Sequence, residues 1–427
     1  MAKGDLLVRV ADKETLDAVK ADTTDILGKI ENSLAPKRYG VKINKLDSNP
    51  DTRIEYIYDA AGMKPAKMNF AQGTFDYGDW ADVFFVKNNY PAMVKYDGTE
   101  DYRLNKNDQG LKEDGTPSDI GNVDYPGNAM AVFDGSEGKG KIWLSQYEKG
   151  NYEYIIISDV KYDESYNDFA YVRENGTHAD KLYYPMFAGS YDGTRLRSIA
   201  EQDTYNGANA ATEVERAKAN GKGWDIGSWS KRNLLNCLLT VISKSDNSQE
   251  AFGHGDANTY VDDALQNYGH IKTGTLKNKG QFFGFNDDKH EVKVFFMETW
   301  WGNSHQRIHG LINAKGKLMA KMTPPYNFEG TGYQDTGIAY VGSTSGYQKD
   351  TKMSIFGRLP VNNGGSSNTY TCDYVWWNDT YTCVALVGGY CTNGSYCGAS
   401  CVALICTAGS AIWSIGASVF LEQPNVA

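Results

Sequence analysis

The sequence predicts an α+β protein, in which helices come early and short strands with long connections follow. Three observations predict this class. An amphipathic pattern opens the 427-residue chain, β-rich runs with turn signals fill residues 36–124, and two helical patterns stand among strand-like runs in residues 125–427. We therefore expect an N-terminal helix within residues 1–35, a small mainly β domain at 36–124 and a larger α+β domain at 125–427.

The first expected element is a helix over residues 12–34, "DKETLDAVKADTTDILGKIENSL", with Asp12 as its N-cap. Its core positions follow the 3-4-3-4 spacing of a short heptad seam: Leu16, Val19, Thr23, Ile26 and Ile30. One such helix is marginal in water by itself, and Ile at core positions favours three strands over two. The pattern predicts a trimeric coiled coil; the alternative is an amphipathic helix packed on its own domain.

Residues 36–124 are predicted to be mainly β. The runs "RIEYIY" (53–58), "DVFFVK" (82–87) and "AMVKYDG" (92–98) are rich in β-branched and aromatic residues, which favour strands. Asp97-Gly98 and Asp114-Gly115 are typical of turns.

The larger part contains two predicted helices, "TEVERAKANGK" (212–222) and "SWSKRNLLNCLLTVISKS" (228–245). The second has one apolar face, made by Leu234, Leu235, Leu238, Leu239 and Ile242. The run "YEYIIISDV" (152–160) predicts a buried strand, and residues 291–317, which include Trp300-Trp301-Gly302, are rich in strand-forming residues.

The composition argues against several classes of function. Acidic side chains outnumber basic ones by 53 to 43, and a nucleic-acid surface needs clustered Lys and Arg. The motifs GxGxxG, HExxH and GxSxG and the Walker loop do not occur. His305 and His309 are four residues apart but follow a strand-like run, so a shared metal-ligand face is not expected. We predict a protein that is not an enzyme, with no catalytic residues, no cofactor, no metal and no nucleic-acid partner.

The seven cysteines are predicted to be free thiols. The N-terminus "MAKGDLLVRVADKETLD" lacks the apolar core of a secretory signal, which indicates synthesis in a reducing cytoplasm without a signal peptide. Cys237 lies in the second helical pattern and is expected to be inert core. The other six have spacings unlike the paired CxxC of zinc sites: Cys372, Cys383, Cys391, Cys397, Cys401 and Cys406.

The end of the chain has an unusual composition. Residues 380–421 contain no Lys, Arg, Asp, Glu, His, Gln or Met. Residues 401–421 are long enough to span a bilayer, but they are rich in Gly, Ser and β-branched residues and have no flanking basic cluster. Short strands at "VALVGG" (384–389), "SCVALI" (400–405) and "SVFLE" (418–422) fit the pattern better, so no membrane insertion is expected.

The stretch "WWNDTYTCVALVGGYCTNGSYCGASCVALICTAGSAIWSIGASVFL" (376–421) resembles the variable region of proteins diversified by diversity-generating retroelements. The chain is similar to receptor-binding tail proteins, or tropism determinants, of gut bacteriophages and prophages. The similarity covers nearly the whole chain, through "YGVKINKLDSNPDTRIEYIYDAAGM", "LYYPMFAGSYDGTRLRSIAEQ" and "VFFMETWWGNSHQRIHGLIN". The "ALVGG…C…G…CG…C" and "WWGN" stretches are its most specific parts.

This resemblance implies a C-type-lectin fold of the formylglycine-generating-enzyme type in residues 125–427, with a variable region at about 374–421 on one exposed face. It implies a homotrimer on a virion tail, with other phage tail proteins and a host cell-surface receptor, protein or glycan, as partners. Two rival functions are a bacterial surface adhesin of the same fold and a formylglycine-generating-type oxidase. The adhesin would carry a signal or lipobox, and the oxidase a reactive cysteine pair in a defined pocket.

The resemblance also explains the missing residue types. Mutation of the adenines in an Asn codon yields Tyr, Cys, Ser, Gly and other residues, but not Lys, Glu, Gln, Met or Trp. Trp413 should therefore belong to the fixed scaffold, together with "ALVGG", Gly394, Cys397-Gly398, Cys401 and "IGAS". The expected ligand-binding display positions are Tyr381, Cys383, Tyr390, Thr392, Asn393, Ser395, Tyr396, Ser400, Ile405 and Cys406.

Overall fold

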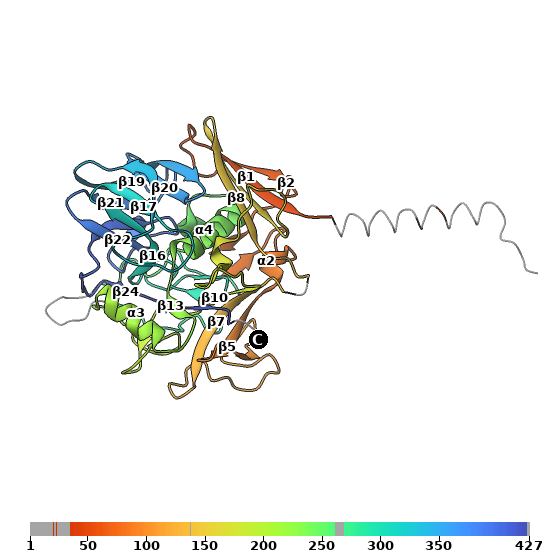
Figure 1. The fold of residues 1–427 in the computed structure, drawn as a ribbon. Coiled ribbons are helices and arrows are strands. Elements are labelled where there is room, and N and C mark those ends of the chain that lie inside the picture. The colour runs from red at the N-terminus through yellow and green to blue at the C-terminus, as the bar shows by residue number, and fades with distance from the viewer. Residues whose placement is uncertain (1–19, 21–22, 24–34, 137, 261–268, 425–427) are drawn as a thin grey trace, which may run out of the picture. The chain divides into compact units, whose positions relative to one another are not determined.

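The computed structural model describes residues 20, 23, 35–136, 138–260 and 269–424 (Figure 1). The chain divides into two compact units, Met1–Lys37 and Arg38–Ala427. The predicted coiled-coil helix at residues 12–34 lies outside the described residues, apart from Lys20 and Thr23, which are helical. Every strand that the structure describes belongs to the second unit.

A four-stranded antiparallel sheet contains the first strands of this unit. Its order is β2-β1-β9-β8, with bounds Ile54–Tyr58 (β2), Arg38–Asn44 (β1), Tyr152–Ser158 (β9) and Trp143–Lys149 (β8). Val41 and Ile43 of β1 are buried and Lys42 and Asn44 are less so, the alternation expected of a sheet with one covered face.

A six-stranded sheet brings the C-terminal strand beside strands from much earlier in the chain. Its order is β13-β25-β10-β7-β5-β6, with bounds Trp224–Ile226 (β13), Val419–Glu422 (β25), Lys181–Pro185 (β10), Gly127–Asp134 (β7), Asn89–Lys95 (β5) and Glu100–Arg103 (β6). All these pairs are antiparallel. Every residue of β7 is buried, because this central strand has both faces covered.

A nine-stranded mixed sheet contains three strands from the uncharged residues 380–421, namely β22, β23 and β24. Its main path is β18-β17-β16-β22-β23-β21-β19-β20, with bounds Gln334–Ala339 (β18), Lys317–Ala320 (β17), His305–Ala314 (β16), Thr382–Val387 (β22), Val402–Cys406 (β23), Tyr374–Asn378 (β21), Ser343–Ser354 (β19) and Gly357–Asn363 (β20). The ninth strand, β24 (Ile415–Gly416), pairs in parallel with β16. The strands predicted at 384–389, 400–405 and 418–422 are confirmed as β22, β23 and β25.

The remaining elements are short. Three two-stranded pairs are β3 (Lys67–Asn69) with β4 (Thr74–Asp76), β11 (Ser190–Tyr191) with β12 (Leu196–Arg197), and β14 (Lys293–Val294) with β15 (Met297–Glu298). The described helices are α2 (Phe84–Lys87), α3 (Ala210–Lys218), α4 (Trp229–Ser243), α5 (Ser248–Phe252) and the 3-10 turns η1 (Phe169–Tyr171) and η2 (Gly394–Tyr396).

The α+β class is confirmed, and so are both predicted helices of the larger part, as α3 and α4. The Asn209 side chain caps α3 by accepting a hydrogen bond from Thr212 N. The strand predicted at "DVFFVK" is wrong, since Phe84–Lys87 form one helical turn. Val83, Phe85 and Val86 are all buried, so the run lacks the alternation of a half-covered strand, and Val83 O accepts from the amides of both Val86 and Lys87.

Strands from both sides of the expected boundary at residue 125 share sheets. β1 and β2 pair with or lie beside β8 and β9, and β5 pairs with β7 (Figure 1). Apart from the two-stranded pair β3–β4, the strands of residues 36–124 thus share their sheets with later strands, and Arg38–Ala427 is one compact unit. The local strand pattern carried no information about these long-range partners.

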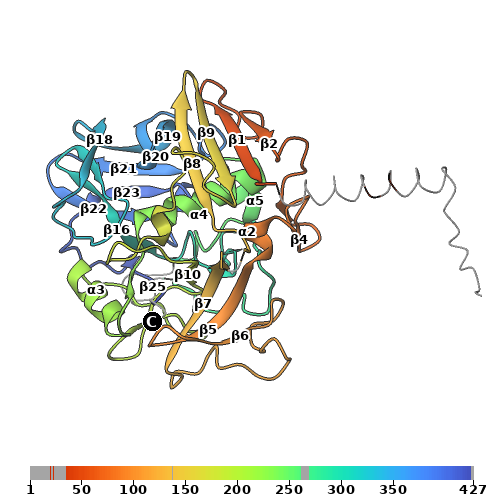
Figure 2. The same ribbon diagram turned by 45° about the vertical axis from the view of Figure 1, so that its right-hand side comes forward.

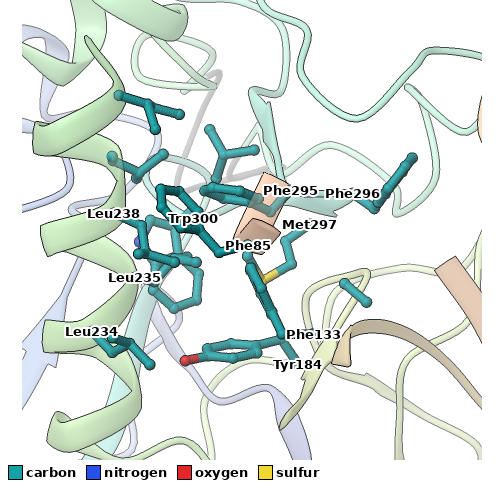
Figure 3. Close-up of a cluster of buried hydrophobic side chains, with 14 of the residues drawn as sticks. Phe85, Phe133, Tyr184, Leu234, Leu235, Leu238, Phe295, Phe296, Met297 and Trp300 are labelled. Atoms are coloured by element: carbon teal, nitrogen blue, oxygen red, sulfur yellow. The ribbon is translucent and has the colours of Figure 1, made fainter. Parts of the chain in front are cut away.

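Helix α4 lies at the centre of the unit (Figure 2). It contacts β1 and β9 of the four-stranded sheet and β16 and β20 of the nine-stranded sheet. Figure 3 shows Leu234, Leu235 and Leu238 facing an aromatic cluster. In that cluster the rings of Phe133 and Tyr184 are 5.5 Å apart. The inner face of the nine-stranded sheet packs in a second core cluster, which includes Trp229 of α4, and parts of the opposite face are exposed.

Candidate ligand-binding face

The candidate site lies on the outer face of the nine-stranded sheet. Successive side chains of β21 point to opposite faces of this sheet. Val375 and Trp377 are buried in the core cluster that contains Trp229 of α4. Tyr374 and Trp376 point the other way and are partly exposed. Because β21 lies between β19 and β23, its outward side chains have neighbours on both sides.

Two neighbouring groups of aromatic rings lie on this face, and we call them together the aromatic tract: Tyr347, Tyr374, Trp376 and Tyr396 in one group, Tyr390 and Trp413 in the other. Tyr374 stacks on Tyr396 with ring centroids 4.1 Å apart, and it lies 4.5 Å from Trp376. Tyr347 meets both tyrosines edge-on, at 5.1 and 5.5 Å. Four of the rings come from β19, β21 and η2, and Tyr390 and Trp413 come from loops, so the tract depends on the folded sheet.

A histidine links the two halves of the tract. The His305 ring lies 5.9 Å from Trp376 and 5.0 Å from Tyr390, and Tyr390 meets Trp413 at 5.6 Å. His305 itself is buried beneath these rings. The tract is therefore a row of partly exposed rings on a buried imidazole.

Hydroxyl and amide groups border the tract, and we call them the polar rim: Thr344, Ser345, Asn363, Ser367 and Ser395. Tyr347 Oη lies 2.6 Å from Ser395 Oγ, and Tyr374 Oη lies 3.4 Å from Ser345 Oγ. Asn363 Nδ2 donates to Thr344 Oγ1 and to the Ser345 carbonyl. The rim offers hydrogen-bond donors and acceptors without a formal charge.

Side chains from outside the uncharged segment hold its backbone. Arg232 Nη2 and Asn236 Nδ2, both from α4, donate to the Ala399 carbonyl at 3.0 and 2.6 Å. Asp373 Oδ2 accepts from Ser400 N, and Gln348 Nε2 donates to the Ser400 carbonyl. These anchors bind main-chain atoms, so they do not depend on which side chains the anchored residues carry.

The same arrangement fixes the turn that bears Tyr390. Cys391 N donates to the Asn303 carbonyl, and Thr259 N donates to the Cys391 carbonyl. Gly394 N donates to the Ala257 carbonyl, and Gln249 Nε2 donates to the Gly394 carbonyl. The "WWGN" stretch thus supports the loop from below.

A buried ion pair anchors the segment farther along. Arg307 Nε lies 2.6 Å from Glu213 Oε2, and neither side chain is exposed. Arg307 Nη2 donates to the Ser410 carbonyl, and Nη1 donates to the Ala408 carbonyl. Burial raises the pKa of Glu213 to about 7, although Arg307 opposes the shift. This pair ties α3 and β16 to the loop that leads to Trp413.

Two glycines predicted as scaffold have backbone conformations that suit glycine. Gly388 and Gly389 have φ of 89° and 79°, and a Cβ on Gly389 would lie 2.6 Å from Cys397 Sγ. Leu386 of the same scaffold stretch is buried, and so are Val402 and Leu404 of β23. Trp413 is half-buried and lies in the tract.

The predicted display positions divide by exposure. Tyr381, Thr392, Ser395, Tyr396 and Ile405 are exposed, whereas Tyr390, Asn393, Ser400 and Cys406 are half-buried. Tyr381 is 57% exposed and Tyr396 38%. Only Tyr390, Ser395 and Tyr396 of the ten belong to the tract or its rim. Asn393 Oδ1 accepts from Tyr390 N, so this side chain shapes the loop as well.

Cys383 is the display position that the structure contradicts. It is fully buried in β22, whose last five residues are all buried. One side of β22 packs into the core with Ala385 and Val387, and the other into a small cluster with Val384 and Leu386. A strand between β16 and β23 with both faces covered leaves no surface for Cys383.

Sequence reasoning missed four residues of the tract: Tyr347, Tyr374, Trp376, and Trp413, which it assigned to the fixed scaffold. Tyr374 and Trp376 were within the expected variable region but not among the display positions. The alternation in "YVWWN" (374–378) was the available signal, since it separates the outward rings of Tyr374 and Trp376 from the inward side chains of Val375 and Trp377. No local pattern places Tyr347 beside them, because β19 reaches β21 only through sheet pairing.

None of the seven cysteines forms a disulfide, and all but Cys406 are buried. Burial raises the pKa of Cys383 to about 11 and that of Cys391 to about 12, and it raises the pKa values of Cys397 and Cys401 well above the ordinary range. Such thiols are held protonated, whereas a nucleophilic cysteine needs a lowered pKa.

We expect all seven cysteines to be alkylated when the protein is denatured without reductant, because none is bonded to another. In native protein the reaction should be slow, since a buried thiol with a raised pKa yields little thiolate. Intact mass spectrometry measures both. Pairs that react only after reduction would contradict the prediction.

Acidification should destabilise the fold through His305. Burial lowers the pKa of His305 to about 4, against about 6.5 in an unfolded chain. Between these values the unfolded state takes up a proton that the folded state does not, so stability falls as the pH drops from about 6.5 to 4. The full loss in the free energy of unfolding is about 3 kcal/mol. Denaturant unfolding of wild type and His305→Gln at pH 7 and 5 measures it; the variant should lose less stability than wild type. The same pH dependence in both proteins would be the contrary result, and His290→Gln is the exposed control.

A cavity elsewhere does not bear on the predicted site. It has a volume of about 240 Å³ and lies beside β13 and β25, on Asp225, Lys231 and Tyr326. Its lining mixes three acidic with three basic side chains and includes no predicted display position: Glu174, Asp225, Glu422, Lys218, Lys222 and Lys231. This charge pattern favours no particular class of ligand.

Among residues 35–136, 138–260 and 269–424, no group of three or more His, Cys, Asp or Glu side chains is placed to hold a metal ion. Within the same ranges no helix is long and apolar enough to cross a membrane. Comparison with known proteins found no matching family model and no matching curated protein.

Proposed function

We propose that this chain is the receptor-binding protein of a bacteriophage tail and recognises a host cell-surface ligand through the aromatic tract. The observation that carries the proposal is that the backbone and the side chains of residues 388–410 have different roles. Side chains from outside the segment bind its backbone, while its own tyrosines and hydroxyls face outward. Such a surface varies its side chains without losing its backbone geometry.

The proposal includes a finer fold and an origin. The larger part of the chain is a C-type-lectin fold of the formylglycine-generating-enzyme type, and residues 374–421 are its variable region, diversified by a retroelement. The outward rings of β21, the anchored loop and the uncharged composition support this reading. Tyrosine supplies a large contact area with few rotatable bonds, which is why recognition surfaces are rich in it.

An adsorption experiment tests the function. Fluorescent full-length protein is added to a panel of gut bacterial isolates, and binding is measured by flow cytometry. We expect strong binding to a few strains and none to most, because specificity resides in one side-chain surface. Uniform binding, or binding to none of a broad panel, would refute a receptor-binding role.

The adhesin alternative predicts a different location. A tail protein should be found by mass spectrometry in purified phage particles, whereas an adhesin should be found in the cell envelope. The oxidase alternative is disfavoured by the raised pKa values of Cys391, Cys397 and Cys401, because thiolate chemistry needs the opposite shift.

The protein should be a trimer. In a monomer the apolar side chains of the seam from Leu16 to Ile30 would be exposed to water, whereas a three-stranded coiled coil buries them. Three binding faces also raise the overall affinity, by about 10²–10⁴, without any new contact. Light scattering of the full chain at micromolar concentration measures the mass, with residues 36–427 as the monomeric control. A full chain that is monomeric would contradict the expectation.

A further inference from the structure

We propose that the ligand of the aromatic tract is an uncharged oligosaccharide. This inference rests on the proposed receptor-binding function and names the chemistry of its ligand. Three features of the face carry it: the flat rings, the hydroxyl and amide groups around them, and the absence of Lys, Arg, Asp and Glu from residues 361–372 and 380–421, which build much of it.

The rings supply the apolar part of the contact. A pyranose ring has a face of C–H bonds that packs against an aromatic face, with the removal of apolar surface from water as the driving force. Tyr374, Tyr396 and Trp376 are partly exposed and lie within 4.1 to 6.1 Å of one another. Neighbouring rings at this spacing suit a chain of sugar units better than one small molecule.

The rim supplies the polar part. Sugar hydroxyls donate and accept at the same atom, so they need partners that do both or that offer each side by side. Ser345, Ser395 and Asn363 have this character, and they contact tract hydroxyls or each other. A site built to bind hydroxyl groups discriminates strongly, because its own polar groups are left unpaired when the hydroxyl is missing.

The lack of charge separates sugars from other ligands. Residues 361–372 and 380–421 contain no Lys, Arg, Asp or Glu. About a quarter or more of a typical protein surface consists of charged residues, and a desolvated charge without a partner is strongly unfavourable. A polyanion would need the clustered Lys and Arg that these segments lack. Asp373 lies below the face but is buried, and burial raises its pKa well above the usual range.

Charged residues do occur next to these segments, and Asp51, Glu250 and Asp288 line a pocket together with Ser367 and Ser395 of the polar rim. Lys349 lies beside Gly364, where a Cβ on the glycine would be 3.6 Å from the lysine Cδ. Asp379 accepts a hydrogen bond from Gly342 N at the far end of β21. Neither side chain contacts a ring of the tract through a described interaction, so the ring surface itself remains uncharged.

The experiment uses full-length protein and the isolates to which it binds. Cells are left untreated, oxidised with periodate, which cleaves vicinal diols of sugars, or digested with protease. We expect periodate to abolish binding and protease to leave it unchanged. Binding that survives periodate and is lost after protease would overturn the sugar proposal while the receptor-binding function stands. Absence of binding to all untreated cells would instead count against the function itself.

Variants connect the result to the tract. Neutral polysaccharide purified from the bound cells is titrated against the protein, with Trp fluorescence as the readout. We expect Tyr374→Ala to weaken binding about thirtyfold or more and Tyr374→Phe to keep most of it, because the ring supplies the contact. Tyr162→Ala, an exposed tyrosine remote from the tract in sequence, is the matched control. Equal affinity for wild type and Tyr374→Ala would overturn the assignment to this face.

Discussion

Arg358→Ala is expected to lower the free energy of unfolding by about 3–5 kcal/mol, because it leaves two buried carboxylates without their main partner. Arg358 Nε donates to Glu153 Oε2 at 2.8 Å, and its two terminal nitrogens bind Asp246 at 2.5 and 3.0 Å. The Glu153 and Asp246 side chains are fully buried. Burial alone would raise the pKa of Asp246, but Arg358 and Arg53 outweigh it and lower the pKa.

This ion-pair cluster joins separate parts of the fold. Glu153 belongs to β9 of the four-stranded sheet, Arg358 belongs to β20 of the nine-stranded sheet, and Asp246 lies between α4 and α5. Urea unfolding followed by tryptophan fluorescence measures the effect. Lys272→Ala, which breaks the exposed pair with Asp203, should change stability by less than about 1 kcal/mol. A loss for Arg358→Ala as small as that of this control would contradict the prediction.

Tyr396→Ala is expected to weaken adsorption to susceptible cells about thirtyfold or more while the melting temperature stays nearly constant. The Tyr396 ring is partly exposed and stacks on Tyr374, so its removal takes away binding surface and little core. Binding isotherms on cells and thermal unfolding of the same samples measure the two effects. Tyr390→Ala should show the same direction with more loss of stability, because Tyr390 is half-buried.

Leu386→Ala provides the matched opposite case. Leu386 is buried between Val384 and Ala403 in the same segment, and truncation of a buried leucine reduces stability by about 2–5 kcal/mol. Unchanged adsorption together with a collapsed melting temperature for Tyr396→Ala would mean that this tyrosine is core. The tract would then not be a binding surface.

The elements with strong local patterns were predictable from the sequence. The leucine face of α4 and the short strands β22, β23 and β25 follow from apolar periodicity and from the flanking Gly and Ser residues. The short run at Phe84–Lys87 was not, since its apolar residues fit either a strand or a buried helical turn. The prediction that Cys383 is an exposed display position was wrong for a related reason. Composition alone does not distinguish a strand with both faces covered from an exposed one.

The candidate site was predictable only in part. Tyr390 and Tyr396 follow from the segment's composition and from its resemblance to a variable region. The sequence does not predict Tyr347 or the anchoring roles of Arg232 and Arg307. Their partners lie about 50 to 170 residues away in the chain. Such contacts are determined by strand pairing and helix packing, which produce no local pattern in the sequence.

The backbone anchors of residues 388–410 have a consequence for engineering. Since Arg232, Arg307, Asp373 and Gln348 bind carbonyl or amide groups, substitutions at exposed positions of the segment leave these bonds in place. Changes at separated sites should then combine nearly additively. The exposed side chains of the segment can therefore be exchanged while its backbone stays constant. A combinatorial library at Tyr381, Thr392, Ser395, Tyr396 and Ile405 would sample new binding specificities.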